Sequence, residues 1–135
     1  MTGFLLDTNA LSDLVRHPAG LIARRIAAEG EDAVCTSIVV AAELRYGACK
    51  RGSSRLTERV EALLAELTVL PFEAPADAAY GEIRAALEAA GTPIGGNDLL
   101  IAAQARAAGL VVVTANLREF GRVEGLRVEN WLEPA

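Results

Sequence analysis

Three acidic residues, Asp7, Glu43 and Asp98, stand out because each lies in or beside an apolar stretch. Asp7 ends the apolar run 4–6, Glu43 lies in a helical pattern that we expect to be substantially buried, and Asp98 opens another helical pattern. Taken singly, Asp7 fits a turn former and Asp98 a first-turn acid favoured by the helix dipole. Clustered carboxylates, however, repel one another unless a cation neutralises them, and oxygen ligands without histidine or cysteine suit Mg²⁺ or Mn²⁺. The residue types therefore indicate a catalytic site for one of these metals.

A metal held by carboxylates can activate a water molecule and stabilise the charge that develops on a phosphodiester, so hydrolysis of a nucleic acid fits this site. Ribonucleases that activate the ribose hydroxyl need two acid/base groups near neutral pH, and this chain has one histidine. We expect that residue, His17, to lie in a surface loop before Pro18. Phosphate-transferring and receiver-type α/β proteins would show DxD or a suitably placed lysine, whereas this chain has DTN and a single lysine, Lys50.

Short apolar runs alternate with helical patterns along the chain, which predicts parallel strands joined by helices and an α/β fold. Ligands of such sheets bind at the carboxyl ends of the strands, where Asp7 and Thr114 fall and where the Asp98 helix can arrive. The predicted strands are 4–6, 33–36, 69–70, 110–113 and 126–128. The predicted helices start at Thr8 or Asn9 as capping residues, at 21, at Ser37 (ending near Gly47), at 56 (ending at 67), around 80 (closing at Gly91), and at Asp98 after an Asn97 cap.

Composition sets the size and setting of the protein. A chain of 135 residues with 52% hydrophobic residues predicts one domain over 1–135. No apolar run approaches the roughly 18 residues of a membrane span, and no cleavable leader is visible, so we expect a soluble, cytoplasmic protein without a membrane partner. Cys35 and Cys49 are too few for a disulfide framework and lack CxxC spacing, which favours buried free thiols.

The net charge of −5 argues against a protein that coats nucleic acid by bulk electrostatics. A local basic surface remains open, as does an ordinary solvated one, because eight of the 13 basic residues fall in the first 60 positions. Arg16, Arg45 and Arg51 are candidates for RNA contacts. The eight residues are Arg16, Arg24, Arg25, Arg45, Lys50, Arg51, Arg55 and Arg59.

Four segments, in order and spacing, resemble the signature segments of PIN domains of the VapC toxin type. They are LLDTNALSDL, VVAAELRYG, PIGGNDLLIAAQA and VVVTANLREF, and the similarity continues to the closing GLRVENW. The resemblance implies an α/β/α sandwich around a mostly parallel sheet. It also implies an endoribonuclease dependent on Mg²⁺ or Mn²⁺ that acts on structured RNA such as tRNA, forms homodimers, and is inhibited by a VapB-type antitoxin through a basic side chain. Asp7, Glu43 and Asp98 match the metal-binding acids of the family.

The fourth position of the family's site falls in TAN, where many members have aspartate and this chain has Asn116, which the resemblance places among the catalytic residues. An amide can orient water or phosphate but binds a cation less strongly, so the number of metals stays open. Glu119 reaches the same pocket only if this segment makes a helical turn, and otherwise is a solvated charge. We expect Thr114 and Asn9 to support the site. The alternative function is a non-catalytic partner-binding module, against which the retention of all three acids argues.

Overall fold

A five-stranded sheet in the order β3-β2-β1-β4-β5 forms the centre of the protein, and its four strand pairings are all parallel. The computed structural model describes residues 3–133. This sheet confirms the α/β fold predicted from the alternation of strands and helices. The strands are β1 (Phe4–Leu6), β2 (Val34–Ser37), β3 (Thr68–Leu70), β4 (Val111–Val113) and β5 (Val128–Glu129).

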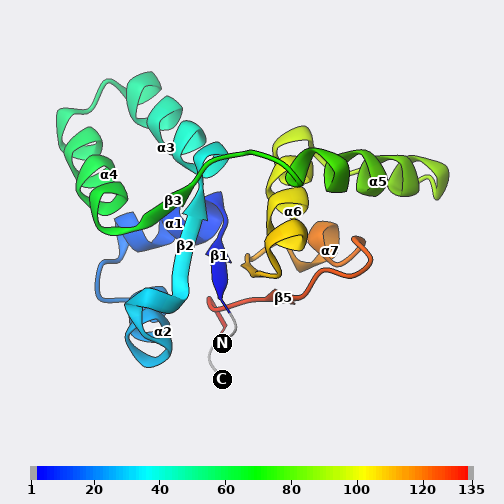
Figure 1. The fold of residues 1–135 in the computed structure, drawn as a ribbon. Coiled ribbons are helices and arrows are strands. Elements are labelled where there is room, and N and C mark those ends of the chain that lie inside the picture. Colours follow the sequence, from blue (N-terminus) through cyan, green and yellow to red (C-terminus); the bar gives the residue numbers. More distant parts are fainter. Residues whose placement is uncertain (1–2, 134–135) are drawn as a thin grey trace.

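Helices cover both faces of the sheet, with α1 to α4 on one side and α5 to α7 on the other (Figure 1). This arrangement follows from parallel pairing, because each connection must cross back over the sheet. A short 3₁₀ turn, Glu31–Ala33, leads into β2. The helices are α1 (Thr8–Arg16), α2 (Leu21–Glu29), α3 (Ile38–Arg51), α4 (Ser54–Glu66), α5 (Ala76–Ala89), α6 (Gly96–Ala108) and α7 (Leu117–Phe120).

The core lies around β1, the central strand, and its neighbour β4, and the residues of both strands are all buried. Leu11 of α1 and Val40 of α3 are fully buried in the helix layer on one side, and Ile101 of α6 is fully buried in the layer on the other. A strand covered on both faces has no room for polar side chains, so the first polar residues come just after it ends. This is why Asp7 and Thr114 meet at the carboxyl edge of the sheet.

Helix α3 is longer than predicted. We expected its end near Gly47, but the helix continues to Arg51 and stops at Gly52, which has a φ of 63°. Helices commonly end at a residue with a left-handed backbone conformation, which glycine adopts most easily. A glycine inside a helix lowers the stability of the helix by only about 0.5–1 kcal/mol relative to alanine, so it need not end the helix. Gly47, which we predicted to end the helix, therefore lies inside it.

Two predicted helix caps were wrong. Asp7, and not Thr8 or Asn9, caps α1, because its side chain accepts a hydrogen bond from the amide of Ala10. Asn97 lies inside the first turn of α6, which has Gly95 at its cap position and no side-chain cap. In both cases the helix begins at or before the residue that we predicted as its cap.

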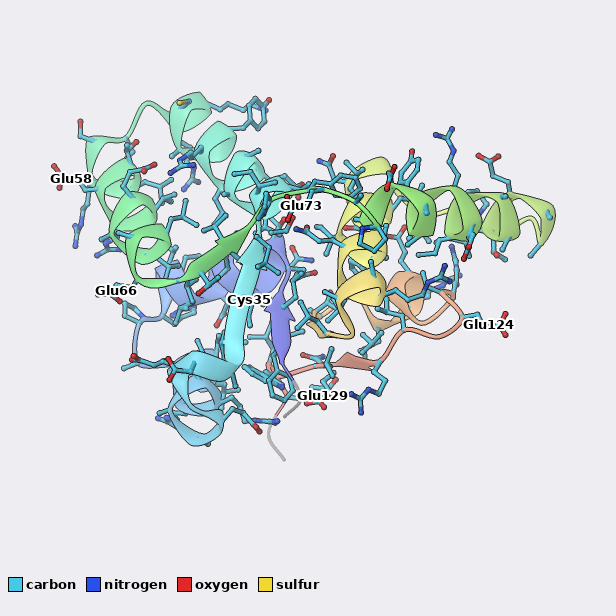
Figure 2. All side chains as sticks on the ribbon, viewed as in Figure 1. Cys35, Glu58, Glu66, Glu73, Glu124 and Glu129 are labelled. Carbon is cyan, nitrogen blue, oxygen red and sulfur yellow. The ribbon has the colours of Figure 1, made fainter. Side chains whose placement is uncertain are left out.

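The prediction of buried thiols was wrong for Cys49. Cys35 is half-buried in β2, where Figure 2 labels it, and burial raises its pKa to about 11. Cys49 is exposed because it lies on the outward side of α3, next to Ala48, which is buried. Both are free thiols. Between residues 3 and 133, no helix combines the length and apolar character that crossing a membrane requires.

Candidate active site

Asp7 is the most buried acid of the candidate site, with 2% of its surface exposed. It follows β1, and its amide donates a hydrogen bond to the carbonyl of Val113 in β4 at 3.0 Å. Its carboxylate caps α1 by accepting from the Ala10 amide at 2.9 Å. Burial raises the pKa of Asp7, and hydrogen bonds from Thr114 and the amides of Ala10 and Asn9 partly oppose this rise. The sheet and the helix together fix this carboxylate in one place.

Glu43 lies on α3 and approaches Asp7 from the neighbouring element. Its side chain is half-buried, less than expected for its segment, because Val40 and Leu44 occupy the core-facing side of α3. The hydroxyl of Thr8 donates a hydrogen bond to Oε1 of Glu43 at 2.5 Å. This bond links the start of α1 to α3 across 35 positions of sequence. This hydrogen bond fixes the position of one carboxylate oxygen of Glu43.

Asp98 lies in the first turn of α6 and has a strongly perturbed pKa. Burial, followed by the hydrogen bond and the charge of Glu119 and by the charges of Asp7 and Glu43, raises the pKa of Asp98 to about 7. Each of these charges acts on Asp98 because the side chains lie near one another. The structure thus brings the three predicted acids together and adds Glu119 to them.

The turn after β4 positions Glu119. Residues 117–120 form α7, so the helical turn on which the interpretation of Glu119 depended is present. The amide of Asn116 donates to the hydroxyl of Thr114 at 2.8 Å, and Nδ2 of Asn116 donates to Oε2 of Glu119 at 2.8 Å. Oδ1 of Asn116 accepts from the amide of Glu119 at 3.4 Å. Both polar atoms of the Asn116 side chain are therefore directed to Glu119.

The other predicted residues lie away from this cluster or are engaged elsewhere. Asn9 is exposed and contributes its amide, not its side chain, to Asp7. Arg45 is bound to Glu61 by two hydrogen bonds of 2.9 Å, which neutralises its charge locally. Arg16 lines a surface hollow of about 620 Å³ at the far end of α1, whose lining includes none of the clustered acids. Arg51 is exposed at the end of α3.

Sequence reasoning missed the bond between Thr8 and Glu43. Thr8 stands next to Asp7 in the DTN segment, so its position near the site was visible. Its partner, however, lies on another helix, and only the packing of α1 against α3 brings the two side chains together. A local sequence signal for this bond does not exist.

The acids of the cluster are arranged loosely and lack basic partners. Within residues 3–133, no three acidic, histidine or cysteine side chains lie close enough to enclose an ion by themselves. In the same part of the chain, none of the ion pairs includes an acid of the cluster. Mg²⁺ keeps several of its waters and binds through one or two carboxylates, so a loose cluster of uncompensated carboxylates fits it, whereas a tight cage would fit zinc.

Parallel α/β proteins with several carboxylates and no histidine at the carboxyl edge of the sheet form a class suited to hydrolysis assisted by a hard metal. Comparison with known proteins identifies the family within this class. The family model for the PIN domain matches residues 4–126. The chain belongs to the PIN-domain family, among its VapC-type ribonucleases.

The similarity to individual relatives extends over nearly the whole chain. Ribonuclease VapC2 of Haemophilus influenzae is 41% identical, with 98% of this chain and 100% of the relative covered. The tRNA(fMet)-specific endonuclease VapC of Shigella flexneri is 40% identical, with 97% and 99% covered. Among solved structures, DNA-bound VapBC from Salmonella typhimurium matches with a TM-score of 0.88 at 39% identity, with 97% of this chain and 99% of that chain covered.

Proposed function

We propose that this protein is an endoribonuclease dependent on Mg²⁺ or Mn²⁺ that cleaves structured RNA, with tRNA as the first candidate, in the cytoplasm. The observation that supports this most is that Asp7, Glu43 and Glu119 all act on the carboxylate of Asp98, in a chain of the VapC family. The tRNA(fMet)-specific names of the relatives from Shigella flexneri and Salmonella typhimurium support the choice of substrate.

Asp7, Glu43 and Asp98 are the residues that would hold the metal, in part through the water molecules that Mg²⁺ keeps. When bound, the metal supplies an activated water and stabilises charge on the phosphodiester. Asp7 is kept in position by Thr114 and two amides, and Glu43 by Thr8. These bonds leave carboxylate oxygens of fixed orientation, which is the preorganisation that a charged transition state needs.

In this proposal Glu119, predicted as a supporting residue, supplies the fourth carboxylate, and the amide of Asn116, predicted as a catalytic group, holds that carboxylate. Asn116 uses both of its side-chain polar atoms on Glu119, so it acts as a positioning residue. The hydrogen bond and charge of Glu119 help to raise the pKa of Asp98 to about 7, so Asp98 tends to hold a proton until a cation replaces it. A residue that fixes a carboxylate can thus stand where many family members have the carboxylate itself.

A VapB-type antitoxin is the proposed protein partner, and a homodimer is the proposed assembly. The neighbours from Salmonella typhimurium and Rickettsia felis are VapBC complexes, which supports such a partner for this chain. An acid cluster without a basic neighbour attracts a guanidinium group, so an arginine of the inhibitor is the expected blocking group.

The test is cleavage of total RNA from the host by the purified, partner-free chain with Mg²⁺, with Mn²⁺ and with EDTA. Asp98→Asn is compared with Asp77→Asn, because Asp77 is an exposed acid in the first turn of α5 and makes a matched control. We expect discrete fragments with 5′-phosphate ends only when metal is present, their loss in Asp98→Asn and their retention in Asp77→Asn. Fragments that persist in EDTA would contradict metal dependence. Intact RNA with a folded, metal-binding protein would favour the partner-binding module.

A further inference from the structure

The outward side of α3 continues from the acid cluster as a strip made of Tyr46 and Lys50. Glu43, Tyr46 and Lys50 are spaced three and four residues apart, so their side chains lie on one side of the helix. The rise from Glu43 to Lys50 is roughly 10 Å at about 1.5 Å per residue. That length equals about three steps of a stacked nucleic-acid strand at about 3.4 Å each.

Tyr46 is an exposed aromatic side chain, with 66% of its surface open to solvent. Nζ of Lys50 lies 5.9 Å from the centre of its ring. Within residues 3–133, two other aromatic rings also have a cation over them, but each of these cations forms an ion pair as well. Arg25, which lies over Trp131, pairs with Glu29 and Glu129.

Arg84, which lies over Tyr80, forms an ion pair with Glu88. Among residues 3–133, by contrast, none of the ion pairs includes Lys50. The strip therefore has a ring and a charge that the fold itself does not use.

The charges around the strip favour a polyanion as its occupant. Arg45 of α3 is neutralised by Glu61, so it does not compete for phosphate. Glu58 of α4 projects away from α3 and the sheet (Figure 2). An aromatic face beside a free ammonium group is the combination that binds single-stranded nucleic acid, by stacking on a base and pairing with a phosphate.

Resting on the proposed function, we propose that Tyr46 and Lys50 form a binding strip for the RNA strand whose phosphodiester lies at the acid cluster. Tyr46 stacks on an unpaired base next to the cleavage point, and Lys50 binds a phosphate about three nucleotides from it. The strip selects RNA with an unpaired loop at the cleavage point, because a base inside a duplex presents no free face to the ring.

The test measures binding separately from cleavage. A 12-nucleotide single-stranded RNA of mixed sequence with a fluorescent end label is titrated with the Asp98→Asn protein in Mg²⁺, and its anisotropy is followed. Adding Tyr46→Ala should weaken binding at least fivefold, and Tyr46→Phe should restore it to within twofold, because stacking needs only the ring. Ile38→Ala, which removes another exposed apolar side chain of α3, should leave affinity unchanged.

Lys50 is tested by the salt dependence of the same binding. Lys50→Gln should lower the slope of log affinity against log salt concentration by about 0.7, the value for one phosphate contact on a single strand. Arg24→Gln removes one exposed positive charge from α2 and should leave the slope unchanged.

Wild-type cleavage, measured alongside, separates the two proposals. Cleavage with unchanged RNA affinity in Tyr46→Ala, or an unchanged slope in Lys50→Gln, overturns the strip and leaves the function standing. Such a result would leave this side of α3 as a docking surface for a protein partner. RNA binding that depends on Tyr46 in a chain that cleaves no RNA supports the strip and contradicts the nuclease. Absence of RNA binding in all variants overturns the strip.

Discussion

At the scale of single residues, the site depends on groups that hold the carboxylates as much as on the carboxylates. Thr8 donates to Glu43, Thr114 to Asp7, and Asn116 to Glu119. Partners of this kind orient metal ligands, and their loss typically lowers metal affinity or activity by about 10- to 100-fold. Substitutions of these neutral residues should therefore change metal affinity or activity measurably, as substitutions of the acids should.

Replacing Thr8 by valine keeps the shape of the side chain and removes the hydroxyl that binds Glu43. We expect Thr8→Val to raise the Mg²⁺ concentration for half-maximal effect about tenfold. The measurement is the Mg²⁺ dependence of the melting temperature together with that of RNA cleavage. Thr8→Ser retains a hydroxyl and serves as the control, and equal behaviour of the two variants would show that the hydrogen bond has no role in the site.

At the scale of elements, α3 is the helix whose length matters most to function. It begins beside the acid cluster, contains Glu43, and extends to Arg51 because its interior glycine does not stop it. Gly47 and Gly52 have opposite roles on this one helix. A Cβ atom added at either position would meet nothing within 4 Å, so only backbone conformation decides the effect of a substitution.

Gly47→Ala should raise the free energy of unfolding by about 0.5–1 kcal/mol, because alanine loses less backbone freedom than glycine on entering a helix. Gly52→Ala should lower it by about 1 kcal/mol or more, because the φ of 63° is unfavourable for a residue with a Cβ atom. Urea unfolding of the two variants and the wild type measures both changes. Shifts of the same sign would contradict the assigned helix end.

At the scale of the whole molecule, the parallel sheet collects four carboxylates at one edge at a cost in stability. The folded protein keeps a proton on Asp98 up to about pH 7, whereas the unfolded chain releases it near pH 3.8. The raised pKa of Asp7 acts in the same direction. Between these pH values the folded state binds more protons than the unfolded state, so stability decreases as pH rises.

Without metal, the free energy of unfolding should therefore fall between pH 4 and pH 8, to the extent that these two groups determine it. Mg²⁺ should offset more of this loss at pH 8 than at pH 5, because it binds the ionised cluster of the folded state. Urea unfolding followed by the fluorescence of Trp131, the single and buried tryptophan, measures this. Asp98→Asn should flatten the pH dependence, and an unaltered slope in that variant would rule out Asp98 as its source.

Much of the fold could be predicted from the sequence alone. The apolar runs 4–6 and 110–113 predicted β1 and β4, and the alternation of strands and helices predicted the parallel sheet. The ends of elements were predicted less well, as Gly47 and Asn97 show, because a terminus depends on small differences between neighbouring capping positions. Burial of Cys49 was mispredicted because the number and spacing of the cysteines do not indicate which side of a helix a cysteine occupies.

The sequence by itself determined which residues could do chemistry, because residue type and local periodicity are properties of short segments. Asp7 at a strand end and Asp98 at a helix start were visible in this way. Only the tertiary structure decided that Thr8 holds Glu43, that Glu119 faces Asp98, and that Glu61 neutralises Arg45. These contacts join separate elements, and the packing and register that create them depend on the whole chain and not on any one segment.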